Sequence, residues 1–304
     1  TPLHAVASDT SGLTPFRYGF SVGALSQVDV NDAQAALEIW LNRVSRSQEM
    51  DLAPGVEVYH DGQALMTATV EGDLDAVSLL ALEYLAIRDR AGLVPVMAGS
   101  SDGSASRTYL LLVRRDSGIT GLDDLANRNL LVLTGGLGRL PRLWLDVVLR
   151  REGHPDSASH FLSVKEAGKA SRTVLSVFFG QAHACVVPRR TFRTMAELNP
   201  QLADELVPLA TSPELLWGIT CFRAGFDKDR RETISRAALE MHTDPEGMQA
   251  LMLFGLDRMV RIGPSDLESV ERLAREHENL AAELGNGTTS GGAGRSGNGE
   301  GGKD

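Results

Sequence analysis

Apolar residues recur along this chain with two different periods. Short apolar runs of strand length, such as residues 17–22 and 129–133, are each followed by a segment in which apolar side chains recur every three or four positions. The first such segment places the following residues on one helical face: Ala33, Leu37, Trp40, Leu41 and Val44. Strands that alternate with amphipathic helices predict the α/β class, with a mostly parallel, doubly wound sheet.

The same order of elements is predicted twice, once in each half of the chain. The first half has expected strands at 17–22, 55–60, 74–79 and 93–98, with helices at 62–71 and 80–91. The second half has expected strands at 129–133, 160–164, 183–187 and 206–210, with helices at 169–179 and 189–198. Three short matches keep the same order in the two halves: residues 20–23 with 133–136, residues 72–77 with 180–185, and residues 93–96 with 206–209. We therefore expect two similar α/β lobes.

Two extended segments connect these lobes. Residues 108–116 and 215–223 are too apolar and too extended for loops, and together they predict a two-segment hinge. The expected division is a flexible N-terminus at 1–14, a first lobe formed by 15–113 and 215–284, a second lobe formed by 114–214, and a disordered tail at 285–304. The last helices, near 229–242, 246–254 and 266–284, should pack mainly on the first lobe.

The formal net charge is −10 over 304 residues, and the chain has no block of basic residues. Such a chain is a poor candidate for binding nucleic acid or an anionic membrane, so any bound anion must be held by local groups. The histidines show no metal-ligand spacing, and no metal site is predicted. Cys185 and Cys221 lie in apolar, strand-like runs. Buried free thiols and a disulfide in an oxidising compartment are both open.

The segment LLVLTGGLGRLPR places glycines between an expected strand and an expected helix. A dinucleotide fingerprint needs a third glycine where Pro141 stands, and an acidic residue after the next strand, and both are missing. No cofactor is therefore predicted. Two interpretations of the segment stay open. In the first, Thr134, Gly135 and Gly136 form an anion-binding turn (the anion cradle) at the start of a helix, and the Arg139 guanidinium also binds the anion. In the second, the segment is a plain strand-to-helix turn and Arg139 is solvated.

Several stretches resemble the phosphonate-binding solute receptors of ABC importers, a branch of the type II periplasmic binding proteins. Residues 70–76 (VEGDLDA) precede the third strand, and Tyr84 follows it at the place of the family's cleft tyrosine. Residues 109–126 (YLLLVRRDSGITGLDDLA) are similar to the family's crossover into the second lobe, and Ser212-Pro213 is similar to its second hinge segment. The resemblance implies two lobes that close on a small ligand.

The resemblance further implies an extracytoplasmic or periplasmic solute-binding protein, although the start of this chain shows no signal peptide. Its ligand would be a small anion of the phosphonate or phosphate type, and its partner an ABC permease or a membrane sensor. We expect a monomer that binds no nucleic acid. The residues expected at the ligand are Ser26, Gln63, Ser78, Tyr84, Thr134, Gly135, Gly136, Arg139, Lys169 and Arg189.

The cradle departs from the family, because only Thr134 remains of a hydroxyl-rich turn. This departure leaves two alternatives, another small anion or a sensing or interaction module with a degenerate cleft. An enzyme on the same fold is a third hypothesis. We find no nucleophile or acid–base pair at the expected cleft, and we predict no enzymatic activity. Trp217, on the second hinge segment, is interpreted as a packing residue.

Overall fold

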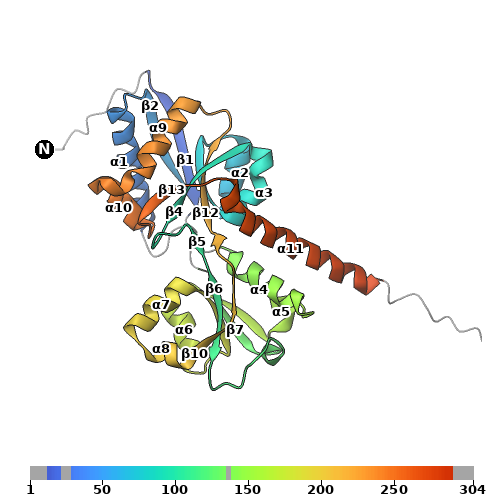
Figure 1. Ribbon diagram of the computed structural model, residues 1–304. Helices are drawn as coiled ribbons and strands as arrows, with labels where there is room; N and C mark the ends of the chain where they lie inside the picture. The colour runs from blue at the N-terminus through green and yellow to red at the C-terminus, as the bar shows by residue number, and fades with distance from the viewer. Residues whose placement is uncertain (1–11, 22–28, 135–137, 290–304) are drawn as a thin grey trace, which may run out of the picture.

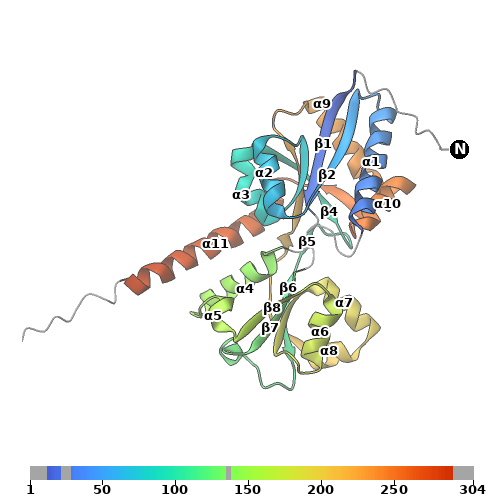
Figure 2. The same ribbon diagram turned by 180° about the vertical axis from the view of Figure 1, so that it is seen from behind.

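The computed structural model describes residues 12–21, 29–134 and 138–289. The chain forms two α/β lobes that lie one above the other and are joined by two crossing segments (Figures 1 and 2). Each lobe is built on its own sheet, which is flanked by helices. The predicted α/β class and two-lobe architecture are confirmed.

The first lobe contains a six-stranded sheet in the order β13-β4-β12-β3-β1-β2. Its strands are β1 (Thr14–Ser21), β2 (Leu52–Tyr59), β3 (Ala76–Leu80), β4 (Leu93–Ser100), β12 (Gly218–Arg223) and β13 (Arg258–Arg261). Its helices are α1 (Val30–Ser47), α2 (Gly62–Glu71), α3 (Ala81–Ala91), α9 (Lys228–Leu239) and α10 (Pro245–Leu253), with the 3₁₀ turn η3 (Met241–Thr243). Apolar residues of α2 and α3 belong to one core cluster, and those of α1, α9 and α10 to another.

The second lobe contains a five-stranded sheet in the order β10-β6-β9-β7-β8. Its strands are β6 (Tyr109–Arg114), β7 (Asn129–Leu133), β8 (Ser163–Ala167), β9 (Ala184–Pro188) and β10 (Leu206–Thr211). Its helices are η2 (Asp123–Leu125), α4 (Leu140–Arg151), α5 (Ser157–His160), α6 (Ala170–Phe178), α7 (Arg189–Leu198) and α8 (Gln201–Glu205). The order β8-β7-β9-β6-β10 repeats the order β2-β1-β3-β12-β4 of the first lobe, which supports the internal repeat.

In both sheets most strands run in the same direction, as predicted, but each sheet also contains at least one reversed strand and is therefore mixed. β12 runs antiparallel to β3 and β4, and β6 runs antiparallel to β9 and β10. Each of these two strands enters its sheet after the chain has crossed from the other lobe. It therefore starts at the edge where the parallel strands end. Because β6 belongs to the second sheet, the lobe boundary expected at residue 113 lies too far along the chain.

Aspartate side chains set several helix starts. An N-cap carboxylate accepts a hydrogen bond from the backbone in α1, α2, α9 and α10, from Asp29, Asp61, Asp227 and Asp244 respectively. Asp156 does the same for the short helix α5, where it accepts from the N–H of Ser159 at 3.1 Å. This helix occupies the first residue of the strand predicted at 160–164, so β8 begins at Ser163 instead.

The hinge is a short antiparallel ribbon of β5 (Ser106–Arg107) and β11 (Leu215–Leu216). Beside it, Ser212 ties one crossing segment to the other. Its hydroxyl accepts a hydrogen bond from the backbone N–H of Tyr109 at 2.7 Å, and its own N–H donates to the Tyr109 carbonyl at 2.8 Å. Ser212 is buried. The two crossings are therefore coupled, as a hinge between rigid lobes requires.

The last helix, α11 (Pro264–Thr289), contacts both lobes and then projects away from them (Figure 1). It packs on α3 and β11 and also along α4 of the second lobe. Glu271 pairs with Arg88 of α3, and Glu276 binds Arg151 of α4 through hydrogen bonds of 2.5 and 2.6 Å. The sequence predicted packing mainly on the first lobe, whereas this helix packs on both lobes. The helix also extends past Gly285, where the disordered tail was predicted to begin.

Replacement of Leu273 by alanine tests whether α11 is integral to the fold. Leu273 is 4% exposed within the core cluster that spans the hinge, so Leu273→Ala should lower the free energy of unfolding by about 2–4 kcal/mol. Urea denaturation measures this change. The control Met252→Ala, at a side chain 76% exposed, should change it by less than about 0.5 kcal/mol. Equal stability of the two variants would show that α11 does not pack as described.

The two cysteines do not form the disulfide that the sequence left open. Cys185 lies in β9 and Cys221 in β12, in different lobes, and both are free and fully buried. Burial raises the pKa of both thiols, which makes them poor nucleophiles. We expect a thiol reagent such as Ellman's reagent to leave the native protein unmodified and to modify both cysteines in 6 M guanidinium chloride. Rapid reaction of either thiol in the native protein would contradict this burial.

Candidate functional site

The two lobes meet where the parallel strands end. β1, β3 and β4 end at this edge of the first lobe, and β12 begins there. Leu80, at the end of β3, lies against Gly138 of the second lobe. A Cβ atom on Gly138 would come within 2.6 Å of the Leu80 Cδ1 atom, and the φ of Gly138 is +58°. The positive φ favours glycine here, and any larger residue would also have to displace the Leu80 methyl group.

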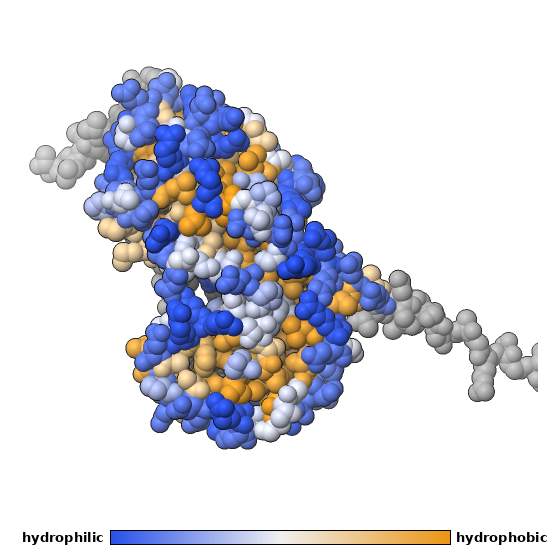
Figure 3. Space-filling model, viewed as in Figure 1, coloured by the Kyte–Doolittle hydropathy of each residue, from blue (hydrophilic) through white to orange (hydrophobic). Residues whose placement is uncertain are grey.

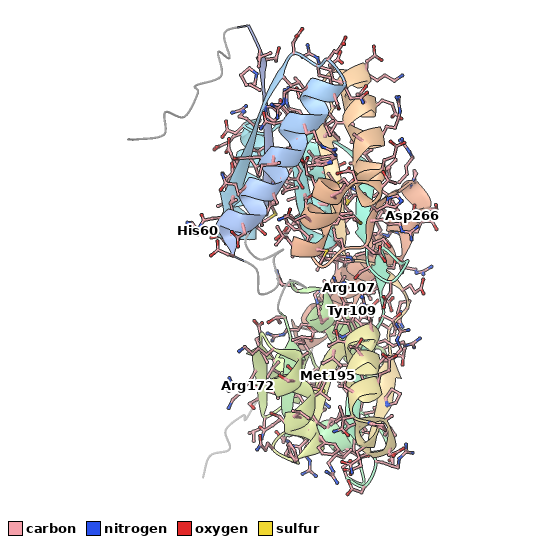
Figure 4. The ribbon with its side chains drawn as sticks, turned by 90° about the vertical axis from the view of Figure 1, so that its left-hand side faces the viewer. His60, Arg107, Tyr109, Arg172, Met195 and Asp266 are labelled. Carbon is pink, nitrogen blue, oxygen red and sulfur yellow. The ribbon has the colours of Figure 1, made fainter. Side chains whose placement is uncertain are left out.

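Arg107 lies in the hinge at this junction (Figure 4). Its guanidinium carbon sits 4.1 Å from the centroid of the Trp217 ring, in a cation–π arrangement. Burial lowers the pKa of Arg107, and the repulsion of Arg190 acts in the same direction. In the described part of the chain, no carboxylate lies within 4 Å of this guanidinium, and no acidic residue is among the groups that shift its pKa.

Tyr109 adds a second polar group at the junction. Its ring is fully buried and stacks on Trp144 with centroids 6.4 Å apart. Its hydroxyl is buried and has no hydrogen-bond partner among the described residues. Burial raises the pKa of this hydroxyl, so Tyr109 stays neutral, and the positive charge of Arg107 acts against that rise. Figure 4 shows Tyr109 directly beside Arg107, between the two lobes.

A pair of arginines bridges the lobes at one side of this junction. Asp102, in the loop after β4, binds Arg190 at 2.8 Å and Arg193 at 3.0 Å, both on α7 of the second lobe. The loop is fastened to the first lobe by Asp257, whose carboxylate accepts from the N–H of Gly103 at 2.9 Å. These ion pairs are half exposed, so each contributes modestly. We call Asp102, Arg190 and Arg193 the interlobe latch.

A family model described as "ABC transporter, phosphonate, periplasmic substrate-binding protein" matches residues 22–267. The chain belongs to this family. The predictions of a solute-binding protein and of a two-lobe periplasmic binding fold are confirmed. The family works outside the cytoplasm with an ABC transporter and a small solute, and it is a family of transport proteins rather than enzymes.

Solved structures agree on the fold. XAC2383 from Xanthomonas citri, bound to ATP, is 16% identical with a TM-score of 0.67, over 88% of this chain and 98% of that one. PhnD1 from Prochlorococcus marinus, in complex with methylphosphonate, is 15% identical with a TM-score of 0.60, over 86% and 97%. A binding protein of a phosphonate transporter from Pseudomonas aeruginosa is 13% identical with a TM-score of 0.61, over 88% of both chains. No curated protein matches the sequence.

The site residues predicted in the second lobe lie along one edge of its sheet. Thr134 directly follows β7 and is half-buried, and its N–H donates to the Ala167 carbonyl at 3.2 Å. Arg139, Lys169 and Arg189 stand at the starts of α4, α6 and α7, and all three are exposed. The structure thus brings these polar groups to the edge that faces the first lobe. Ser26, Gly135 and Gly136 lie outside the described residues.

The residues predicted in the first lobe are scattered. Gln63 is exposed in the first turn of α2, and Ser78 on β3 is bonded to Tyr18. Tyr84 is 4% exposed and lies beneath the guanidinium of Arg88. Glu83 caps α3, because its carboxylate accepts a hydrogen bond from the Leu80 N–H at 2.9 Å. Desolvation raises the pKa of this carboxyl group.

Sequence reasoning missed Arg107 and undervalued Trp217. Arg107 directly precedes the extended run at 108–116, so its place beside the hinge was a usable signal. The stacking partner comes from the other crossing segment, and only the tertiary structure shows that the two meet. Trp217 therefore has two roles, because it packs at the hinge and its ring also holds the Arg107 guanidinium.

Within residues 12–21, 29–134 and 138–289, no three histidine, cysteine or acidic side chains gather as metal ligands would. None of the helices in those ranges combines the length and the apolar character needed to cross a bilayer.

Loss of the interlobe latch should let the lobes separate. Asp102→Asn removes the carboxylate but keeps a residue type that tolerates the φ of +55° found here. Each exposed ion pair contributes up to about 1 kcal/mol, so the separated population should grow several-fold. Small-angle X-ray scattering should then give a larger radius of gyration. The control Asp123→Asn, at a side chain 94% exposed, should leave the scattering unchanged. If both variants give the scattering curve of the parent protein, the interlobe latch does not hold the lobes together.

Proposed function

We propose that this protein is a monomeric periplasmic receptor that binds a small anion between its lobes and presents it to the permease of an ABC importer. The observation that carries this proposal is Arg107, a half-buried cation stacked on Trp217 at the hinge. Desolvation of a cation costs free energy unless an opposite charge compensates it. With no carboxylate nearby in the described chain, an anionic ligand supplies that charge.

The second lobe supplies the other half of the site. Thr134 and Arg139 flank the turn before α4, and the start of that helix adds partial positive charge. An anion on Arg107 and at this turn contacts both lobes at once. Only approached lobes offer both sets of contacts, so binding shifts the molecule toward closure. The relative that binds methylphosphonate supports a phosphonate-like head group.

Isothermal titration with phosphate, methylphosphonate, methanesulfonate and acetate tests the proposal. We expect at least one of these anions to bind, and Arg107→Gln to weaken its binding about 10- to 150-fold. The reason is that a hydrogen bond to a charged group contributes about 1.5–3 kcal/mol. Thr134→Ala and Arg139→Ala should each weaken binding less, because each leaves the Arg107 charge in place.

The matched control is Arg90→Gln, which removes the same charge from an exposed position on α3. It should bind like the parent protein. If Arg90→Gln and Arg107→Gln bind equally well, Arg107 is not part of the site. If the parent binds neither these four anions nor any longer phosphonate, sulfonate or carboxylate, the anion receptor is the wrong function for this cleft, and the interaction module with a degenerate cleft takes its place.

A further inference from the structure

The first lobe contains an apolar cavity that the anion site does not use. It has a volume of about 130 Å³ and lies between the sheet and the helices α1, α9 and α10. Residues of β1, β3, β4 and β12 form one wall, and the helices cover it. The wall residues that matter here are Phe16, Phe20, Trp40, Met97, Ala250 and Phe254. Figure 3 shows apolar residues at the surface around β13 and α10, in the same part of the lobe.

The wall holds one polar feature, a chain of three hydroxyls across neighbouring strands. Ser78 lies 2.7 Å from the Tyr18 hydroxyl and 2.7 Å from the Thr220 hydroxyl. Burial raises the pKa of Tyr18, so its hydroxyl keeps its proton. Three hydroxyls joined by two hydrogen bonds satisfy one another almost completely. The rest of the wall described here is apolar, so an apolar group suits this cavity best.

One end of the cavity reaches the junction of the lobes. Leu80, Gly99 and Trp217 all belong to its lining, and all lie where strands of the first lobe end or begin at that edge. Trp217 is shared, because its ring also carries the Arg107 guanidinium. An anion on Arg107 is therefore held beside the mouth of an apolar cavity.

We propose that the ligand is an amphipathic anion whose head group binds Arg107 and whose apolar group of about six carbon atoms enters this cavity. This rests on the proposed function and narrows its substrate class. The size follows from the volume, since an apolar protein cavity of about 150 Å³ holds a benzene molecule. Aryl- and alkylphosphonates, and the matching sulfonates and carboxylates, share this chemistry.

A chain-length series on the unmodified protein is the first test. Isothermal titration with methyl-, propyl-, pentyl- and phenylphosphonate should show the dissociation constant falling about fourfold for each added methylene, the value expected for burial of a CH₂ group. Hexyl and octyl chains should bring no further gain, because the cavity is then full. Benzenesulfonate and benzoate identify the preferred head group.

A cavity-filling variant locates the apolar group. Ala250 on α10 is fully buried and lines the cavity, so Ala250→Leu should occupy its space. We expect the pentyl-to-methyl affinity ratio to fall at least tenfold, while methylphosphonate binds within about threefold of the parent. Ala86→Leu is the matched control, an exposed alanine on α3 that is not in the lining, and it should keep the ratio. Circular dichroism and thermal unfolding check that both variants fold.

The outcomes separate the two proposals. If methylphosphonate binds through Arg107 but longer chains bind no better, the anion receptor stands and the amphipathic ligand is wrong. The same conclusion follows if the Ala250→Leu variant folds and its affinity still rises with chain length as much as that of the parent. If no phosphonate, sulfonate or carboxylate of any length binds, both proposals are wrong. If Ala250→Leu does not fold, the chain-length series on the parent protein decides.

Discussion

The double crossing between the lobes is the constraint on which this structure depends. Each sheet is completed by a strand that enters from the other lobe, β6 in one and β12 in the other. The two crossings are held together by the paired hydrogen bonds of Ser212 and Tyr109, so neither can move alone. The short ribbon of β5 and β11 is therefore where we expect the hinge between the lobes. Arg107 lies in that ribbon and Trp217 follows it, which couples ligand contact directly to the hinge.

The proposed anion site lies in a chain whose overall charge is negative. The net charge of −10 repels anions at a distance, so recognition depends on groups that act over a few ångströms. Arg107 is suited to this because burial removes its water and the Trp217 face replaces only part of that stabilisation. The apolar cavity beside it adds a gain from burial that does not depend on charge. In the ligand that we propose, the charge of Arg107 selects the head group and the volume of the cavity limits the apolar group.

Closure is also governed by contacts far from the ligand. The interlobe latch on Asp102 joins the lobes at one side, and α11 bridges α3 and α4 through Glu271 and Glu276. Because α11 buries Leu267, Val270 and Leu273, a change in the angle between the lobes must slide or bend this packed helix. The free-energy difference between the open and closed states therefore has contributions from the ligand, the interlobe latch and α11, each of a few kcal/mol at most.

The sequence alone determined the elements and their repetition, because period and caps are local properties. The helix at 62–71, the strand at 129–133 and the helix at 189–198 agree with the structure to the residue. It also placed Thr134 and Arg139 at an edge that faces the first lobe. Tertiary structure alone decided that β6 and β12 reverse, that Tyr84 is buried beneath Arg88, and that Arg107 meets Trp217. These last facts join residues distant along the chain, and no local pattern encodes which distant side chains meet.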